Sequence, residues 1–523
     1  TLPDKYRFML FGDNRELELV WNGKTSDVTN VVLPFQTVEH VDEPRPESVR
    51  NQQMDIFDNS GRQLKGWTNK LIWGDNKYIL SSLKSGPLRE QIEANGGIKL
   101  ILIDPPFDVG ADFTMEVAIG DEIFEKQANV LEEVAYRDTW GKGADSFLVM
   151  IHERLSLMRD LLASDGSIYV HMGPKVSHFV KLVMDDVFQG SNFRSEIIWR
   201  RSNAHNKTTD QYGPIHDKIL FYTKTDKFTF HPGTRPFSRG YIEGRFKYKD
   251  KRGIYQPNYL TGPGIRKGAS GLPWHGFNPT NARRHWAIPS KLRALLSSDT
   301  KDLTIQQVLD ECLKEDLLVI PKKENGQPMY KQYMNEGVPY QDLWAYQPNT
   351  KNTLYKTDEC IDEDVKWLEQ ESEVRGYPTQ KPEGLISRII ETSSDENDIV
   401  ADFFAGSGTT CAVAERLGRK WICSDLGKFS IHTTRKRIIN LQRELKTAGK
   451  NYRAFEVLNL GKYEHQYFVS GMSELDGKVQ TQKETNRETA FNNLILQAYE
   501  GEPISGFRTL RGKKNNRVVA IGP

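Results

Sequence analysis

Cysteine is scarce in this chain, with four residues among 523 and no C-x₂-C pair. Such usage favours neither a disulfide-stapled secreted domain nor a zinc site, so we expect reduced, structural cysteines in a cytoplasmic protein. They are Cys312, Cys360, Cys411 and Cys423. The 11 histidines form no H-E-x-x-H motif or other paired ligand spacing, and no metal site is predicted. No apolar run reaches 18 residues and no signal peptide is visible, so neither a membrane span nor export is expected.

Complete nucleotide-binding motifs are missing as well. Gly23-Lys24-Thr25 has the ending of a phosphate-binding loop, but Glu18 stands where that motif needs glycine. Gly406-Ser407-Gly408 lacks the third glycine of the dinucleotide fingerprint. The sequence therefore predicts no ATPase or helicase motor and does not favour NAD.

Positive and negative charges nearly balance over the whole chain, but they are unevenly distributed along it. The net charge is +1, and 37% hydrophobic and 27% charged residues are typical of a soluble globular protein with two to four domains. Residues 230–291, in contrast, hold 12 Lys and Arg against two acidic residues, a net charge of +10, with aromatic residues between them. Cations neutralise phosphates and rings stack on bases, so this block predicts nucleic-acid binding. The candidate contacts, for each of which a solvated basic face is the alternative, are Arg235, Arg239, Arg245, Lys247, Lys249, Arg266, Arg283 and Arg284.

The segment 99–110, KLILIDPPFDVG, predicts a buried strand that ends in a rigid turn. Leu100–Ile103 form a short, wholly apolar run, as in strands buried on both faces of a parallel sheet. The two prolines that follow cannot continue the hydrogen-bond ladder and fix their own φ. Asp104–Phe107 therefore presents a carboxylate, a proline carbonyl and an aromatic ring at the carboxyl end of a strand, where open α/β sheets bind ligands.

These three groups suit the activation of an exocyclic amine on a nucleobase. Such an amine is a poor nucleophile because its lone pair is delocalised into the ring. The carboxylate of Asp104 and the carbonyl of Pro105 would accept its two N–H hydrogens and favour a pyramidal nitrogen, while Phe107 would stack on a base taken out of its duplex. The alternative is a plain strand followed by a rigid turn with a surface aspartate.

A second strand, turn and helix are predicted from 398–410, DIVADFFAGSGTT, and the residues after it. Gly406 and Gly408 permit positive φ and let backbone N–H groups approach a ligand where a helix begins. A further strand ends at Asp425, which is placed to hydrogen-bond ribose hydroxyls.

DPPF together with DFFAGSGTT resembles the amino-group DNA methyltransferases that use S-adenosylmethionine, with the catalytic motif before the cofactor motif, as in their β-group. The resemblance spans residues 71–438 and includes GSIYVHM (166–172) and YPTQKP (377–382). It is closest to the modification subunits of type III restriction systems. It implies a doubly wound, Rossmann-like α/β sheet with circularly permuted motif order and an inserted target-recognition domain.

The same resemblance assigns roles to residues. It implies catalysis by Asp104, Pro105, Pro106 and Phe107. It implies S-adenosylmethionine binding by Asp75, Lys381, Asp402, Phe403, Phe404, Ala405, Gly406, Gly408 and Asp425. The alternative for Asp75 is a helix cap, and for Lys381 an exposed lysine beside a proline turn.

Five parts are predicted along the chain. They are a β-rich N-terminal extension (1–70), a catalytic half (71–225), the target-recognition insert (226–375), a cofactor-binding half (376–445) and a C-terminal extension (446–523). In the first part, Asn22-Gly23 predicts a hairpin between Leu17–Trp21 and Val31–Phe35. We expect a fragment of a longer chain, or a chain trimmed at both ends, because the sequence opens on Thr1 and closes on a strand-like run.

The expected function is site-specific methyl transfer from S-adenosylmethionine to the N6 amine of a flipped adenine in double-stranded DNA, within a restriction-modification system. N4-cytosine methylation needs the same amine geometry, but its family tetrapeptide more often begins with serine. A DNA-recognition subunit without catalytic activity is an alternative that is not an enzyme. RNA is a less favoured substrate than DNA because of the large basic insert. The absence of a Pro-Cys dipeptide argues against cytosine-C5 methylation. By resemblance, the expected protein partners are a second copy in a homodimer and a restriction subunit.

Overall fold

The chain divides into two compact units. A computed structural model describes residues 20–25, 27–42, 63, 66–106, 145–202, 212–297, 299–321, 326–335, 337–368 and 380–460, and the backbone alone of 115–119, 122–126, 144, 502–503, 510–514 and 517–520. Unit 1 comprises Thr1–Gly233, Gln341–Tyr346 and Asp364–Pro523, and unit 2 comprises Thr234–Tyr340 and Gln347–Glu363. The five-part division of the sequence stays a prediction.

A ten-stranded sheet runs through unit 1. Its spatial order is β1 (Gln36–Val41), β20 (Phe455–Asn459), β2 (Asn69–Trp73), β19 (Lys420–Asp425), β18 (Ile399–Asp402), β3 (Ile98–Ile103), β6 (Leu162–Met172), β8 (His216–Thr223), β7 (Phe193–Arg200) and β17 (Leu343–Trp344). Neighbours from β20 to β6 are parallel. β8 runs antiparallel to both β6 and β7, and β1 runs antiparallel to β20. The alternation of strands and helices thus predicted the parallel centre, but it did not distinguish the antiparallel strands on either side.

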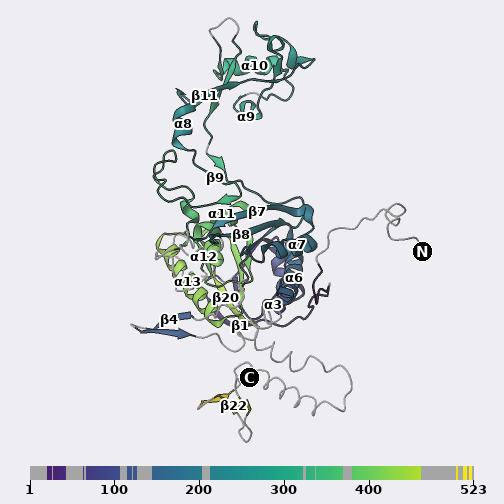
Figure 1. The fold of residues 1–523 in the computed structure, drawn as a ribbon, viewed down its shortest axis with the longest axis vertical. Helices are drawn as coiled ribbons and strands as arrows, with labels where there is room; N and C mark the ends of the chain where they lie inside the picture. Colours follow the sequence, from purple (N-terminus) through teal and green to yellow (C-terminus); the bar gives the residue numbers. More distant parts are fainter. Residues whose placement is uncertain are drawn as a thin grey trace, which may run out of the picture. The chain divides into compact units, whose positions relative to one another are not determined.

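Helices cover both faces of this sheet, which confirms the predicted doubly wound α/β fold (Figure 1). One face packs against α3 (Asn76–Ser85), α4 (Leu88–Ala94), α6 (Ala144–Leu161) and α7 (Ser177–Phe188). The other face packs against α11 (Glu383–Ser393), α12 (Thr409–Arg416) and α13 (Lys428–Thr447). In β3, Ile101 and Ile103 contribute to the first core while Leu100 and Leu102 contribute to the second. A strand that is apolar on both sides can occupy only such a central position.

Unit 2 has a core of its own. Its main sheet is antiparallel, in the order β10 (Tyr248–Asp250), β11 (Gly253–Tyr259), β15 (Met329–Tyr333) and β14 (Leu318–Val319). Helix α10 (Ile305–Lys314) starts at a capping box of Thr304 and Gln307 and buries Val308, Leu309 and Cys312 against Trp286 and Leu260. The other elements are α8 (Arg239–Arg245), α9 (Ser290–Arg293), β9 (Thr234–Arg235), β12 (Thr261–Pro263), β13 (Arg284–Trp286) and β16 (Val338–Pro339).

Two short sheets complete the described backbone. β4 (Met115–Ile119) and β5 (Glu122–Lys126) form an antiparallel hairpin. β21 (Glu502–Pro503), β22 (Leu510–Lys514) and β23 (Arg517–Ala520) form a three-stranded sheet.

The predicted N-terminal hairpin is wrong in its second arm. Asn22-Gly23 does form a turn, in which the N–H of Lys24 donates to the carbonyl of Trp21 over 3.2 Å. Val31–Phe35, however, are not in a strand; the strand begins at Gln36 and pairs with β20. Residues 17–19 of the first arm lie outside the described residues. An apolar run next to a turn signal does not reveal which distant strand will pair with it.

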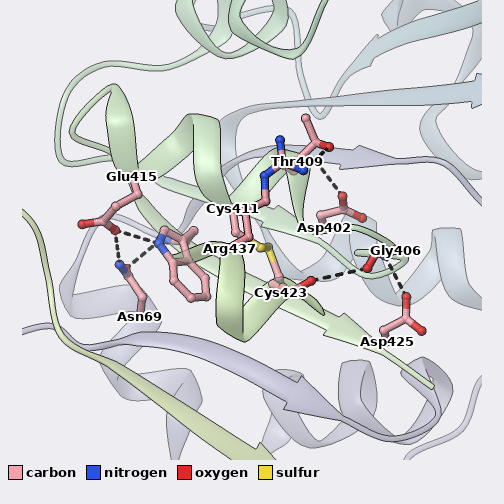
Figure 2. Close-up of a disulfide and its surroundings, with 12 residues drawn as sticks. Asn69, Asp402, Gly406, Thr409, Cys411, Glu415, Cys423, Asp425 and Arg437 are labelled. Atoms are coloured by element: carbon pink, nitrogen blue, oxygen red, sulfur yellow. Dashed lines mark hydrogen bonds between the residues drawn. A yellow bond between two sulfur atoms is a disulfide. The ribbon is translucent and has the colours of Figure 1, made fainter. Parts of the chain in front are cut away.

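The expectation of reduced cysteines is wrong for one pair. Cys411 of α12 and Cys423 of β19 form a disulfide with a Cα–Cα distance of 6.6 Å (Figure 2). They are 12 residues apart in sequence, and they meet because α12 packs directly on the strand that follows it. Cys312 and Cys360 are free and buried. Within the described ranges, no helix has the length and apolarity needed to cross a membrane.

The turn between β18 and α12 requires glycine at position 408. Gly408 is the N-cap of α12 and has φ +74°. A Cβ atom there would lie 2.6 Å from side-chain atoms of Thr434 in α13. The turn is therefore fixed both by its backbone conformation and by close packing against the neighbouring helix.

Replacing Gly408 by alanine should lower the midpoint of thermal unfolding more than replacing Gly449. Both glycines have positive φ, +74° and +67°, but nothing lies within 4 Å of a Cβ built at Gly449. The left-handed conformation costs an L residue about 1–2 kcal/mol, and the contact with Thr434 should add about 1–3 kcal/mol for the variant at 408. Circular dichroism melting curves would measure the difference, and equal shifts for the two variants would contradict it.

Candidate active site

The two motif-bearing segments leave the sheet side by side. β3 and β18 are parallel neighbours, with Leu100 opposite Val400 and Ile101 opposite Ala401. Asp104 follows β3, and Asp402 is the last residue of β18, so both carboxylates lie at the same edge of the sheet. The segments are almost 300 residues apart in the sequence, and the sheet order alone brings them together. Phe107 lies outside the described residues.

The carboxylate of Asp104 is held by two basic side chains from different elements. Nδ1 of His171, in β6, lies 3.0 Å from Oδ1, and Nζ of Lys381 donates to Oδ2. Burial opposes ionisation, but the charges of Lys381 and His171 outweigh it and hold the pKa of Asp104 well below its usual range. The side chain is still 26% exposed. Asp104 is thus an ionised hydrogen-bond acceptor at an accessible position, next to buried Pro105 and half-buried Pro106.

Asp402 begins the glycine-rich turn and stabilises its first residues. It accepts hydrogen bonds from the backbone N–H of Phe404, over 2.9 Å, and from the hydroxyl of Thr410, over 2.6 Å. Burial raises the pKa of Asp402 to about 7, although both hydrogen bonds oppose the rise. Phe403 is fully buried in the core and Ala405 is nearly so. Their packing fixes the start of the turn, and Gly406 (φ +51°) allows it to bend.

Asp425, at the end of β19, closes the same turn (Figure 2). Its Oδ2 accepts from the backbone N–H of Gly406 over 2.8 Å, and its Oδ1 accepts from that of Gly427 over 2.8 Å. On the other side, the hydroxyl of Ser430 donates to the carbonyl of Gly406 over 2.6 Å. Asp425 therefore ties the glycine turn to α13; its predicted contact with a ribose stays a prediction.

A buried arginine supports the base of the turn. Arg437 of α13 donates from NH1 to Oγ1 of Thr409 over 3.0 Å and to the carbonyl of Ser407 over 3.3 Å. Its NH2 pairs with Glu383 at 2.7 Å. Arg437 was not among the residues found from the sequence, because the amphipathic pattern of α13 gives no sign of which basic residue turns inward.

Asp75 and Lys381 both have structural partners. Asp75 caps α3 by accepting from the N–H of Lys77 over 2.8 Å and pairs with Arg154 at 2.9 Å. That geometry is the one expected for a helix cap, and a cofactor contact stays a prediction. Lys381 contacts Asp104, and its backbone carbonyl accepts from the hydroxyl of Thr409 over 3.5 Å. It thus lies between the carboxylate of Asp104 and the glycine turn.

His171 and its partner Asp217 were also missed in the sequence. His171 is the next-to-last residue of GSIYVHM and of β6, and its Nε2 lies 3.2 Å from Asp217 of β8. A polar residue at the end of a buried strand is the available signal, but only the sheet order shows that it faces Asp104.

The basic candidates of unit 2 fall into two groups. Five are exposed and available to a ligand. They are Arg245, Lys247, Lys249, Arg266 and Arg283. The first three lie close together in sequence, from the end of α8 into β10, and the guanidinium of Arg245 is 5.1 Å from the centre of the Tyr241 ring.

The other three candidates are partly buried and bonded within unit 2. Arg235 lies 3.7 Å from Asp362, and Nε of Arg239 donates to a backbone carbonyl over 3.0 Å. Arg284 donates twice to Thr261, over 2.8 Å to its hydroxyl and 2.6 Å to its carbonyl. Arg284 thus joins β13 to β12. All eight DNA contacts stay predictions.

Comparison with known proteins reveals extensive similarity. The N6/N4 DNA methylase family profile matches residues 98–436. The type II methyltransferase M.EcaI of Enterobacter cloacae is 29% identical over 372 residues, which cover 71% of this chain and 69% of that protein. The StyLTI Mod subunit, a type III restriction-modification enzyme of Salmonella typhimurium, is 25% identical over 374 residues. The match covers 68% of this chain but 51% of that subunit, about half of its length.

A solved structure, the M1.HpyAVI-SAM complex, is also similar to this chain. It is 13% identical with a TM-score of 0.32, and the match covers 71% of this chain and 98% of that one. The family profile is more informative, because it starts in β3, before Asp104, and ends in α13, beyond the glycine turn. Since it spans both strand ends and well over half of the sequence, the chain belongs to the N6/N4 DNA methylase family.

Proposed function

We propose that this chain transfers a methyl group from S-adenosylmethionine to the N6 amine of adenine in double-stranded DNA. The observation that supports this most directly is the ionised Asp104 beside the glycine turn, at adjacent strand ends. An ionised carboxylate accepts hydrogen bonds and donates none, as required to hold an amine by its N–H groups. Family membership supports the reaction class, and the choice of adenine rests on the DPPF tetrapeptide.

The side chains around the turn suit the charges of S-adenosylmethionine. The donor is a sulfonium cation that also carries an amine, a carboxylate and a ribose, and it supplies an activated methyl group when bound. Asp402 and Asp425 provide anionic groups near Gly406, and Lys381 provides a cation. Backbone N–H groups at the start of α12 add a positive dipole. We assign these residues to cofactor binding, together with the backbone of Phe404–Gly408.

The residues of the catalytic turn hold and orient the base in this proposal. Oδ2 of Asp104 and the carbonyl of Pro105 accept the two N–H hydrogens of the amine, and Phe107 stacks on the extruded base. The reacting atoms need alignment rather than a strong base, so positioning supplies much of the rate enhancement. When the amine binds, Nζ of Lys381 must either share Oδ2 of Asp104 with the amine or move away from this oxygen.

N4-cytosine methylation is the second candidate, because the same acceptors would hold that amine. Mass analysis of nucleosides from DNA treated with the protein and S-adenosylmethionine decides between them. N6-methyl-2′-deoxyadenosine supports the proposal, and N4-methyl-2′-deoxycytidine overturns the choice of base. Long-read sequencing of the same DNA would identify the methylated site. If calorimetry showed no binding of S-adenosylmethionine, a non-catalytic recognition subunit would replace both candidates.

In this proposal unit 2 recognises DNA. The chain acts as the methyltransferase of a restriction-modification system in the cytoplasm. The net charge of +10 in 230–291 and the five exposed basic residues support DNA binding. The similarity to a Mod subunit supports the modification role. A homodimer and a restriction subunit as partner are part of the same proposal.

Changing Asp104 to alanine should reduce methyl transfer by at least about 10²-fold, since a preorganised electrostatic contact of this kind is removed. Binding of S-adenosylmethionine should stay near normal, because the glycine turn has its own supports in Asp425 and Arg437. Tritiated methyl transfer and calorimetry would measure the two effects. Asp27→Asn, at an exposed position, is the control for loss of one carboxylate. Retained turnover in the Asp104 variant would refute the catalytic assignment.

Affinity for S-adenosylmethionine should increase as the pH rises from 6 to 8. Asp402 has a pKa of about 7 without ligand, so it is protonated in part of the population below that pH. A cationic ligand favours the carboxylate, and binding should therefore release a proton below pH 7 and become up to about tenfold tighter at pH 8. Calorimetry in buffers of different ionisation enthalpy would detect the proton. Asp402→Asn should lose this dependence, and affinity that falls with rising pH in the native protein would contradict it.

The double variant Lys247→Ala/Lys249→Ala should bind DNA less tightly, and its affinity should depend less steeply on salt concentration. Each phosphate contact contributes about −0.9 to the slope of log K against log salt concentration, so loss of two should reduce the slope by about 2. Fluorescence anisotropy at several salt concentrations would measure it. Lys301→Ala/Lys351→Ala removes the same charge from exposed positions outside 230–291 and is the matched control. Equal effects of the two double variants would argue against a localised DNA contact.

A further inference from the structure

The imidazole of His171 lies between two carboxylates from different strands. Nδ1 is 3.0 Å from Oδ1 of Asp104, which follows β3, and Nε2 is 3.2 Å from Oδ2 of Asp217 in β8. The His171 side chain is 4% exposed and that of Asp217 is 6% exposed. A neutral imidazole carries one N–H and can donate to only one of these two carboxylates, whereas the imidazolium ion donates to both.

Further contacts prevent this ring from turning. Oδ1 of Asp217 pairs with Nε of Arg201 at 3.1 Å, so Asp217 is itself fixed. The indole of Trp199 meets the imidazole edge-on, with 5.7 Å between ring centres. The result is a row of alternating charges that ends at Lys381. Its members are Arg201, Asp217, His171, Asp104 and Lys381.

We propose that His171, held by Asp217, is a positioning residue that fixes the carboxylate of Asp104 for methyl transfer. The inference rests on the proposed function and deepens it. Oδ1 of Asp104 is committed to the imidazolium, so the carboxylate cannot rotate and Oδ2 keeps one direction. Because Oδ2 is the oxygen now shared with Lys381, it is also the oxygen assigned to the incoming amine. Misplacement of a reacting group by about 1 Å can cost about 10²-fold in rate.

The charges around His171 favour its protonated form. Burial alone would lower the pKa of His171 and the cation of Lys381 lowers it further, but Asp104 and Asp217 outweigh both and raise it above its usual value. Arg201 faces Asp217 rather than the ring, and the charge of Asp104 also contributes to the raised pKa of Asp402 at the end of β18. The catalytic form should therefore contain the imidazolium and be lost as the pH rises through the raised pKa.

Two amide substitutions separate positioning from simple structural support. In His171→Asn the amide N–H₂ can take the place of Nδ1 and keep the contact with Asp104. In His171→Gln it can take the place of Nε2 and keep the contact with Asp217. We expect the glutamine variant to lose about 10²-fold in single-turnover methyl transfer and the asparagine variant clearly less. Affinity for S-adenosylmethionine should change little in either variant. His178→Asn, on the exposed surface of α7, is the control.

The reverse order of rates would overturn the inference, because a residue that merely joins β6 to β8 would be better replaced by glutamine. Melting curves of the two variants would separate loss of folding from loss of rate.

The pH profile gives a second test through Asp217→Asn, which keeps the shape of the side chain but removes its charge. The pKa of His171 should fall, so the alkaline decline of the methyl-transfer rate should move to lower pH than in the native protein. An unmoved decline would overturn the inference.

A readout independent of turnover is the ¹⁵N shift of the His171 ring in protein labelled only at histidine, assigned by its loss in His171→Asn. Both nitrogens should be protonated at neutral pH in the native protein, and the ring should become neutral at lower pH in Asp217→Asn. A neutral ring in a native protein that methylates DNA would refute this inference alone. Failure of the native protein to methylate DNA would refute the proposed function and this inference with it.

Discussion

The parallel pairing of β3 with β18 is the constraint on which the site depends. Ladder hydrogen bonds set the register of these strands, and the register places Asp104 and Asp402 at one edge. Each strand is buried on both faces, so a slip of one residue would exchange the side chains of two cores at once. The stability of the sheet and the geometry of the site thus have one origin. Arg437, Asp425 and His171 add precision to turns whose positions the sheet has already determined.

Short sequence patterns predicted those strands and turns that are determined by neighbouring residues in the sequence. The apolar run 100–103 predicted a strand and the glycines at 406 and 408 predicted a turn, and both are found. The turn predicted from the prolines after Asp104 continues into residues outside the described ranges and stays a prediction. What the sequence did not reveal depends on sheet order. The contact of His171 with Asp104, the disulfide between α12 and β19 and the pairing of β1 with β20 all join segments whose separation in sequence carries no signal.

Charge composition identified a basic block in what is now unit 2, but not the surroundings of each basic residue. Arg284 and Lys249 look alike in sequence, yet Arg284 joins two strands through Thr261 while Lys249 is exposed. Arginine forms several hydrogen bonds in a fixed plane, so it often supports a fold as well as binding a ligand. In such a block, the structure shows which basic residues are bonded within the fold and which are exposed.

The chain passes between the two units more than once. The chain leaves unit 1 after Gly233, returns for Gln341–Tyr346, leaves again and returns at Asp364. The segment Gln341–Tyr346 contains β17, which pairs with β7 and buries Trp344 in a core of unit 1. A recombination event that exchanged the whole segment 234–363 would therefore import a foreign edge strand, and its fit against Ile198 and Trp199 would decide whether the chimaera folds.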